Sequence, residues 1–187
     1  TMRALKGIRK EDNLRASKNL CIALSWFVST MNQLQINVVD VLWARFPYYC
    51  SYCGSCPCLC KNKKSRNVDK TEKHSNKIPS SIKDWQTMFE EIYPSTSRSL
   101  EHAGIHLAEE TGELSEALLR FRSTREAEDF QEVESESADF LSCIFGVYNS
   151  LSFDLEKDLV IKYDNGCSAC HSVPCVCTYS RMIRSES

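Results

Sequence analysis

The chain has 187 residues, of which 42% are hydrophobic and 26% are charged. This length allows one domain of ordinary size or two small related halves. The formal net charge is −2 and the sequence pI is near 6.1, so the chain as a whole has no reason to be attracted to nucleic acid or to a membrane surface. Six glycines and five prolines exclude a collagen-like polymer. The chain has no apolar run of about 18 residues, which excludes an ordinary transmembrane helix, and its lack of an export signal predicts a cytoplasmic protein.

Apolar residues recur at helical spacing along almost the whole chain. A short apolar stretch at residues 20–28 predicts a buried helix in the first half. Further helices are predicted at about residues 85–92, 99–121, 132–151 and 155–163, and Pro94 ends the first of these. No segment alternates with the period of two that marks a strand. The sequence therefore predicts an all-α protein.

The charges are unevenly distributed. Residues 61–77 carry six lysines and one arginine against two acids, and Val68 is their only large apolar residue. A stretch of this composition cannot bury a core face, so we interpret it as an exposed basic linker, with a nucleic-acid-binding arm as the alternative. Between Glu101 and Asp139 the balance is reversed, with twelve acids against three arginines. Such a concentration of carboxylates either lies on a solvated helix face or attracts cations.

The eleven cysteines reveal an internal repeat. Residues 50–60 read CSYCGSCPCLC and residues 167–177 read CSACHSVPCVC, so both contain the pattern C-S-x-C-x-S-x-P-C-x-C. A shift of 117 residues extends the match upstream, where Leu24 lies over Leu141 and Arg45 over Lys162. This period predicts two copies of a helical hairpin, each followed by a cysteine-rich loop.

The repeat suggests how the chain is organised. The first copy is degenerate, because Asn19 and Ile22 occupy the places of Glu136 and Asp139. Only one carboxylate site is therefore expected in each chain. We predict a degenerate helical repeat at 1–60 that ends in the first cysteine loop at 50–60, a basic linker at 61–79, carboxylate-bearing helices at 80–166, the second cysteine loop at 167–177 and a tail at 178–187.

Each cysteine loop offers four soft thiolate ligands within eleven residues, which suits tetrahedral zinc. Four cysteines close the coordination sphere, so we expect two structural zinc ions that stabilise the fold. An iron–sulfur cluster, disulfides and haem attachment at the C-x-x-C-H segment 167–171 are the alternatives. The expected ligands are Cys50, Cys53, Cys58 and Cys60 in the first loop and Cys167, Cys170, Cys175 and Cys177 in the second.

Two pairs of carboxylates interrupt helix faces that are otherwise apolar. Glu110 and Glu113 lie one turn apart in one predicted helix, and Glu136 and Asp139 lie one turn apart in the next. A loop at about residues 122–129 would let these helices run antiparallel, so that the pairs face each other. The resulting cage of four carboxylates would suit a hard divalent cation, above all Mg²⁺ with a phosphate as further ligand. Solvated helices also carry acids at this spacing without a metal, and this remains the alternative.

The segment H-L-A-E-E-T-G-E-L-S-E-A-L, followed by E-S-A-D-F-L, resembles the MazG-like all-α nucleoside triphosphate pyrophosphohydrolases. This superfamily includes the dimeric dUTPases and the dCTP pyrophosphatases. The resemblance covers about residues 80–165 and implies a bundle of paired helical hairpins. The degenerate copy at 1–60 would then supply helices that family members gain by dimerisation or duplication. The cysteine loops are not part of the usual family pattern.

The resemblance implies hydrolysis of a nucleoside triphosphate between its α and β phosphates, which gives a monophosphate and pyrophosphate. Glu110, Glu113, Glu136 and Asp139 would hold Mg²⁺, and the metal would lower the pKa of a bound water. Either Glu109 or Glu110 would orient or deprotonate that water. The further candidates are Lys162 as a catalytic residue and Lys157, Asn165 and Trp85 as substrate-binding residues.

Two other classes of function remain open. A non-catalytic, zinc-bound helical scaffold would show no magnesium-dependent hydrolysis. A nucleic-acid-associated adaptor would use residues 61–77 as a basic arm and would bind in a salt-sensitive manner. The favoured partner is a nucleoside triphosphate substrate, without membrane association, with nucleic acid disfavoured and with a homodimer left open.

Overall fold

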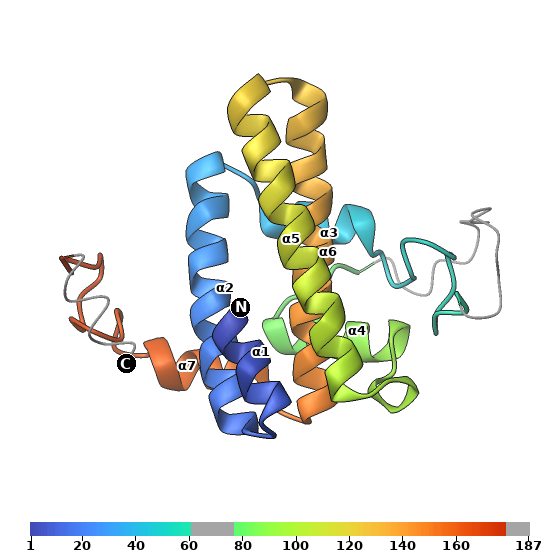
Figure 1. Ribbon diagram of the computed structural model, residues 1–187, viewed down its shortest axis with the longest axis horizontal. Helices are drawn as coiled ribbons and strands as arrows, with labels where there is room; N and C mark the ends of the chain where they lie inside the picture. The colour runs from blue at the N-terminus through green and yellow to red at the C-terminus, as the bar shows by residue number, and fades with distance from the viewer. Residues whose placement is uncertain (61–76, 179–187) are drawn as a thin grey trace.

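The computed structural model describes residues 1–60 and 77–178 (Figure 1). Within these ranges it contains seven α-helices, one short 3₁₀ helix and no strand, which confirms the all-α prediction. The elements are α1 (Met2–Arg9), α2 (Asn13–Leu34), α3 (Val38–Arg45), α4 (Ile82–Ile92), the 3₁₀ helix η1 (Ser95–Ser97), α5 (Leu100–Thr124), α6 (Ala127–Leu151) and α7 (Leu155–Tyr163). Each helix in the described ranges is too short or too polar to serve as a membrane span.

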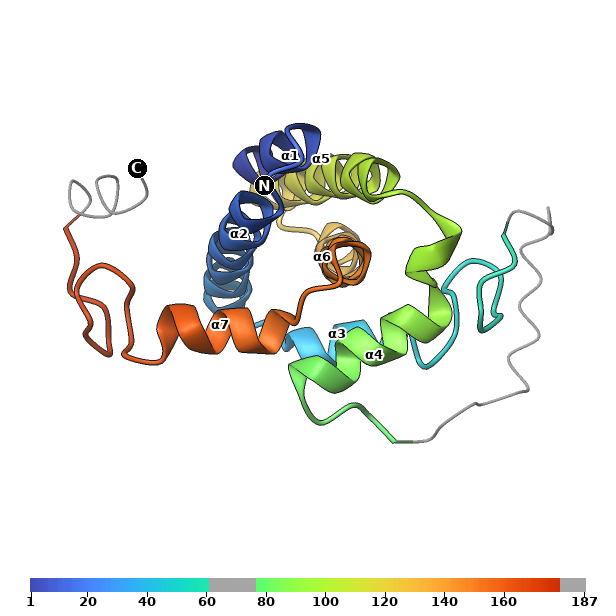
Figure 2. The ribbon, with the colours of Figure 1, turned by 90° about the horizontal axis from the view of Figure 1, so that it is seen from below.

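Helix α6 lies at the centre of the molecule. Figure 2 shows it end-on, with α1, α2, α3, α4 and α5 around it. The Phe27 ring of α2 packs on Phe140 of α6 with 4.9 Å between the ring centroids. On another face of α6, Phe145 stacks on Phe89 of α4 at 5.2 Å. The core therefore surrounds α6, and this helix carries half of the predicted carboxylates.

Local capping signals explain where several helices begin. The Ser81 side chain accepts a hydrogen bond from the Asp84 amide, and the Asp84 side chain accepts one from the Ser81 amide, which forms a capping box at the start of α4. The side chains of Ser99 and Asp154 likewise accept backbone hydrogen bonds at the starts of α5 and α7. The predicted bounds of α7 are confirmed, and those of α4 and α5 are met within a few residues.

The hairpin of α5 and α6 is tighter than the sequence suggests. The predicted loop at 122–129 is wrong, because only Arg125 and Glu126 separate the two helices. Polar residues continue both helices beyond the core, so their loss of apolar periodicity resembles a loop. Arg125 adopts the left-handed conformation with φ 62°, and the rings of Phe121 and Phe130 pack across the hairpin with 5.0 Å between their centroids.

The repeat of 117 residues has counterparts in the structure. Helices α2 and α6 end at the equivalent residues Leu34 and Leu151. Each is followed by a residue in the left-handed conformation, Gln35 with φ 59° and Ser152 with φ 57°. A side-chain cap then starts α3 and α7. A long helix, a left-handed turn and a short helix thus occur twice in the described chain.

The two copies pack crosswise. Helix α3 of the first copy packs against α6 of the second, and α7 of the second packs against α2 of the first. The cysteine loops that follow α3 and α7 lie on opposite sides of the molecule (Figures 1 and 2). The predicted basic linker at 61–79 and the predicted tail at 178–187 fall almost entirely outside the described residues.

Two glycines give a matched test of this packing. A Cβ on Gly7 of α1 would lie 2.8 Å from the Ala16 amide nitrogen of α2, whereas a Cβ on Gly112 of α5 would meet no atom of the described residues within 4 Å. We expect Gly7→Ala to lower the free energy of unfolding by about 1–3 kcal/mol, because the contact is overpacked. Gly112→Ala should raise it by up to about 1 kcal/mol, because alanine favours a helix. Urea unfolding followed by circular dichroism measures both, and equal effects would contradict the packing described.

Candidate functional site

Helices α5 and α6 bring the predicted carboxylates together. Glu110 and Glu113 lie one turn apart on α5, and Glu136 and Asp139 lie one turn apart on α6. One carboxylate oxygen each from Glu110, Glu113 and Glu136 lies within 4.8 Å of the other two. We call these three residues the carboxylate cluster. Three of the four predicted magnesium ligands therefore meet at one place.

Asp139, the fourth predicted ligand, is bound by an arginine from the first half of the chain. Arg45, the last residue of α3, donates from Nε to Oδ1 of Asp139 at 3.1 Å and from Nη2 to Oδ2 at 2.7 Å. A pair of charge-assisted hydrogen bonds in this geometry is among the strongest polar contacts in proteins. The Asp139 side chain is only 16% exposed. Arg45 therefore neutralises the carboxylate next to the cluster.

Burial and mutual repulsion perturb the carboxylate cluster. Oε2 of Glu110 and Oε2 of Glu136 are buried and have no hydrogen-bond partner among the described residues. Burial, reinforced by the charges of Asp139, Glu113 and Glu136, raises the pKa of Glu110 to about 7. Burial and the charges of Asp139 and Glu113 also raise the pKa of Glu136. Arg45 opposes both shifts but does not cancel them.

The donor set fits a hard divalent cation. Carboxylate oxygens are the ligands that Mg²⁺ prefers, and Mg²⁺ usually keeps water or phosphate in its remaining positions. The two unpartnered oxygens of Glu110 and Glu136 would gain a partner from such an ion. Glu113 is exposed, so the cluster opens to solvent on one side. A ligand from solution could therefore reach the cluster.

Several other predicted site residues lie apart from the carboxylate cluster. Glu109 also lies on α5, next to Glu110 in the sequence. Its carboxylate is 58% exposed, and its Oε2 lies 3.4 Å from Nδ1 of His106. Lys157 and Lys162 are on α7, and Asn165 comes just after it. Helix α7 packs against α2 and α4 and runs past α2 on the side away from α5 (Figures 1 and 2). The structure therefore does not group these three residues with the cluster.

Trp85 lies in the core. Its side chain is 5% exposed, and its ring centroid lies 6.3 Å from that of Trp43 and 6.4 Å from that of Phe89. Trp85 and Phe89 lie four residues apart on α4, so both rings face the core from the same side of the helix. Stacking of a base on Trp85 would require these neighbours to move.

Two arginines near the site were missed by the sequence analysis. The sequence repeat pointed to Arg45, which lies over Lys162, but its partner Asp139 is 94 residues away in the sequence. No sequence pattern pointed to Arg98, because it follows η1 in an irregular segment. Its Nε and Nη2 are buried without a hydrogen-bond partner among the described residues. Burial and Glu110 raise the pKa of Cys143 to about 12 while Arg98 lowers it, so both charges act on the same part of α6.

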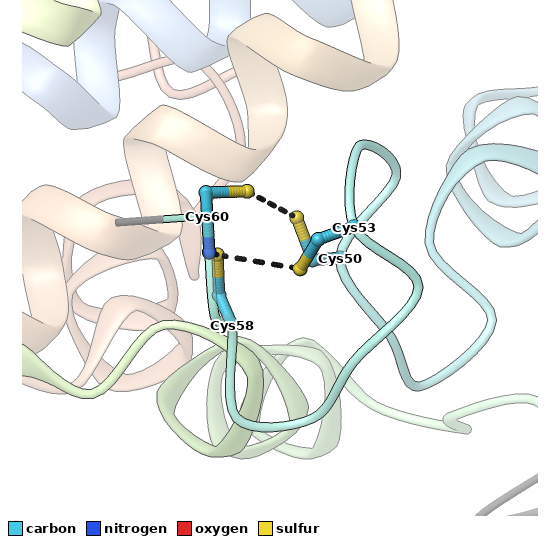
Figure 3. Close-up of side chains that lie close together, drawn as sticks. All are labelled: Cys50, Cys53, Cys58 and Cys60. Carbon is cyan, nitrogen blue, oxygen red and sulfur yellow. Dashed lines mark hydrogen bonds between the residues drawn. The ribbon is translucent and has the colours of Figure 1, made fainter. Parts of the chain in front are cut away.

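The four sulfur atoms of the first cysteine loop converge (Figure 3). Sγ of Cys50 lies 3.6 Å from Sγ of Cys60, and Sγ of Cys53 lies 3.9 Å from Sγ of Cys58. A disulfide bond is only about 2.05 Å long. Four thiolates at about 2.3 Å from a tetrahedral metal ion would be about 3.8 Å apart. The loop therefore has the geometry of a four-thiolate metal site.

The second cysteine loop repeats this geometry. Sγ of Cys167 lies 3.7 Å from Sγ of Cys177, and Sγ of Cys170 lies 3.9 Å from Sγ of Cys175. In each loop the four sulfur atoms lie within 4.8 Å of one another. All eleven cysteines are free thiols, so the disulfide alternative is not seen in either loop. Two cysteine clusters that could bind metal are thus present.

Backbone amides stabilise thiolates in both loops. The Leu59 amide donates to Sγ of Cys53 at 3.3 Å. Although burial opposes it, the amides of Leu59 and Ser55 lower the pKa of Cys53 to about 6. The Val176 amide likewise lowers the pKa of Cys170 to about 6. Thiolates are the form that binds metal, so the backbone favours this form at Cys53 and Cys170, whereas burial raises the pKa of Cys58 to about 11.

The loops differ in their surroundings. In the first loop, Cys50 is 2% and Cys53 is 5% exposed, and the Cys58 amide donates to the Ile92 carbonyl oxygen at the end of α4 with a length of 2.8 Å. In the second loop, Val173 is 85% and Val176 is 71% exposed. The first loop therefore forms part of the packed fold, whereas the second projects from it.

Comparisons of the chain with models of known protein families, with curated proteins and with solved structures found no match.

Substitution of Glu110 tests the charge balance in the cluster. Since its pKa is raised from 4.5 to about 7 on folding, the folded state binds more protons than the unfolded state between these values. Stability without divalent cations should therefore fall as the pH rises from about 5 to about 7, by about 1–2 kcal/mol for this half-buried group. Glu110→Gln should flatten this slope, because glutamine does not titrate. Urea unfolding in chelator-treated buffer over this range measures the slope, and an unchanged slope would contradict the raised pKa of Glu110.

Proposed function

We propose that this protein is a magnesium-dependent nucleoside triphosphate pyrophosphohydrolase of the MazG-like type. The observation that carries the proposal is the convergence of Glu110, Glu113 and Glu136, two of which have a buried oxygen without a partner in the described residues. A divalent cation would relieve their repulsion. The E-x-x-E and E-x-x-D motifs that contain these residues support the same function.

The acidic residues of α5 and α6 would have two roles in hydrolysis, metal binding and proton transfer. Glu110, Glu113, Glu136 and Asp139 would hold magnesium, which would supply neutralisation of the phosphate oxygens and a more acidic bound water. Glu109 or Glu110, the adjacent acids of α5, would accept the proton of the water that attacks the α-phosphorus. The bond from the α-phosphorus to the bridging oxygen breaks as the new bond forms. Pyrophosphate then leaves with that oxygen, and the nucleoside monophosphate remains.

Arginines supply the positive charge near the carboxylates. Arg45 would hold the Asp139 carboxylate in position through its two hydrogen bonds. Arg98 offers two buried N–H groups without a partner in the described chain, beside Gly146 on α6. It is a candidate for contacting the phosphate chain of the substrate. Lys157 and Lys162 would have to reach the site by a change in the position of α7.

The proposed architecture is that of two related hairpins in one chain. The first half would take the place that a second subunit has in dimeric members of the family, and Arg45 would be its contribution to the site. The equivalent place on α2 carries Asn19 and Ile22, which line an open groove of about 410 Å³ together with Trp26. Neither side chain is a carboxylate, so one carboxylate site per chain is expected.

A panel of nucleoside triphosphates, assayed for pyrophosphate release with Mg²⁺, tests the proposal. We expect hydrolysis of at least one member of the panel and none with chelator. Glu113→Gln and Asp139→Asn should each lower kcat/KM by at least about a hundredfold, since each removes a charged magnesium ligand.

Glu128→Gln is the matched control for these variants. Glu128 is exposed in the first turn of α6 and lies outside the carboxylate cluster. Its substitution should leave kcat/KM within about twofold, because a distant surface charge is screened by salt. Absence of pyrophosphate release from every nucleotide, or full activity of Glu113→Gln, would overturn the proposed function and favour the scaffold alternative.

We further propose that the metal in both cysteine loops is structural zinc. Four thiolates around a tetrahedral site are the usual ligand set of such zinc ions, and no ligand position is left for a substrate. The short separations among the four sulfur atoms in each loop support this assignment. An iron–sulfur cluster is the alternative, and metal analysis distinguishes the two.

Equivalent cysteine variants test the zinc assignment. We expect two zinc ions per chain by elemental analysis and one in either Cys53→Ser or Cys170→Ser. Cys53→Ser should lower Tm by on the order of 5 °C or more, because the first loop is packed in the fold and metal binding adds to folding stability. Cys170→Ser should lower Tm less, since the second loop is exposed. Iron in place of zinc, or metal-free wild-type protein purified under reducing conditions, would contradict the assignment.

A further inference from the structure

Two histidines lie one turn apart on α5, on the N-terminal side of the carboxylate cluster. The Nε2 atoms of His102 and His106 are 3.2 Å apart, and the rings are nearly perpendicular, at 88°. His102 is exposed and the side chain of His106 is 45% exposed. Neither residue was assigned a role in the sequence analysis. Both nitrogen atoms thus meet at a solvent-accessible point.

A carboxylate lies beside the Nδ1 atom of His106. Oε2 of Glu109 lies 3.4 Å from Nδ1 of His106, on the opposite side of the ring from His102. In the tautomer that carries its proton on Nδ1, this proton faces the carboxylate and the lone pair of His106 lies on Nε2. Histidine ligands of metal ions commonly have such a carboxylate behind the ring, where it fixes the tautomer and the orientation. Glu109 thus lies behind the His106 ring, and His106 and His102 are the two potential ligands.

The distance between the two Nε2 atoms matches that of two ligands of one ion. Metal–imidazole bonds of about 2.0–2.1 Å at angles between a right angle and the tetrahedral value place the two nitrogen atoms about 2.9–3.4 Å apart. The two Nε2 atoms share one hydrogen bond, and a metal ion takes the place of its proton when both rings carry their protons on Nδ1. The separation of the two nitrogen atoms therefore suits chelation of one ion.

We propose that His102 and His106 form a surface site for a late first-row divalent metal ion, with Glu109 as the residue that orients His106. Imidazole nitrogen is the preferred ligand of zinc, copper and nickel ions, whereas the carboxylate cluster suits harder ions and the cysteine loops suit softer coordination. Glu101 lies in the first turn of α5, where its negative charge offsets the positive end of the helix dipole. Solvent fills the remaining ligand positions. This proposal does not depend on the proposed hydrolase function.

Nickel ion is the probe that tests the site. The zinc-loaded full chain, with Mg²⁺ in excess to occupy the carboxylates, is titrated with Ni²⁺ while the imidazole signals are followed by NMR. Paramagnetic Ni²⁺ should broaden the signals of His102 and His106 first, and the signal of His171 only at much higher concentration. His102→Gln and His106→Gln should each weaken binding on the order of a hundredfold, because chelation is lost. Glu109→Gln should weaken it about tenfold.

A second readout and a matched control keep the test decisive. Bound Ni²⁺ should raise Tm of the wild-type protein but not of His106→Gln, since a ligand of the folded state stabilises it. His171→Gln, at the other histidine of the described ranges, should leave the broadening of the α5 signals unchanged. Broadening that is equal at all histidines, or binding by His102→Gln as tight as by wild type, would overturn the proposal. Loss of hydrolase activity in any variant has no bearing on this result.

Discussion

Repulsion among partly buried carboxylates determines the electrostatics of the site between α5 and α6. One carboxylate oxygen each from Glu110, Glu113 and Glu136 lies within 4.8 Å of the other two, across the hairpin of α5 and α6. Arg45 compensates part of the negative charge through Asp139. This arginine belongs to the first half of the chain, so the charge balance of the site depends on how the two halves pack. Burial, together with the charges of Asp139, Glu113 and Glu136, nevertheless raises the pKa of Glu110 to about 7.

Much of this arrangement can be read from local patterns. Spacing of three residues predicts that Glu110 and Glu113 share a helix face, and apolar periodicity and Pro94 predict several helix ends within a few residues. The Asp139 partner could not be predicted in this way, because the contact with Arg45 depends on tertiary packing across 94 residues of sequence. The length of the loop between α5 and α6 was overestimated for a different reason. Its flanking residues are polar because they extend past the core, and polarity alone does not distinguish an exposed helix from a loop.

The two cysteine loops share a local conformation but differ in burial. Both have nearly the same sulfur separations, and the equivalent hydrogen bonds from Cys50 N to Ser55 O and from Cys167 N to Ser172 O are 3.1 Å and 3.3 Å long. The repeated sequence therefore determines the local conformation. It does not determine burial, which is nearly complete for Cys50 and Cys53 because α4 lies against the first loop. Identical chemistry thus contributes differently to the stability of the fold.

The exchange of short helices between the copies has a topological consequence. Since α3 lies on α6 and α7 lies on α2, each half completes the hydrophobic surface of the other. The covalent connection between residues 60 and 77 is then not what holds the halves together. A protease that cut this connection would leave the two fragments associated in one noncovalent complex. Either fragment produced alone would expose a hydrophobic surface and tend to self-associate.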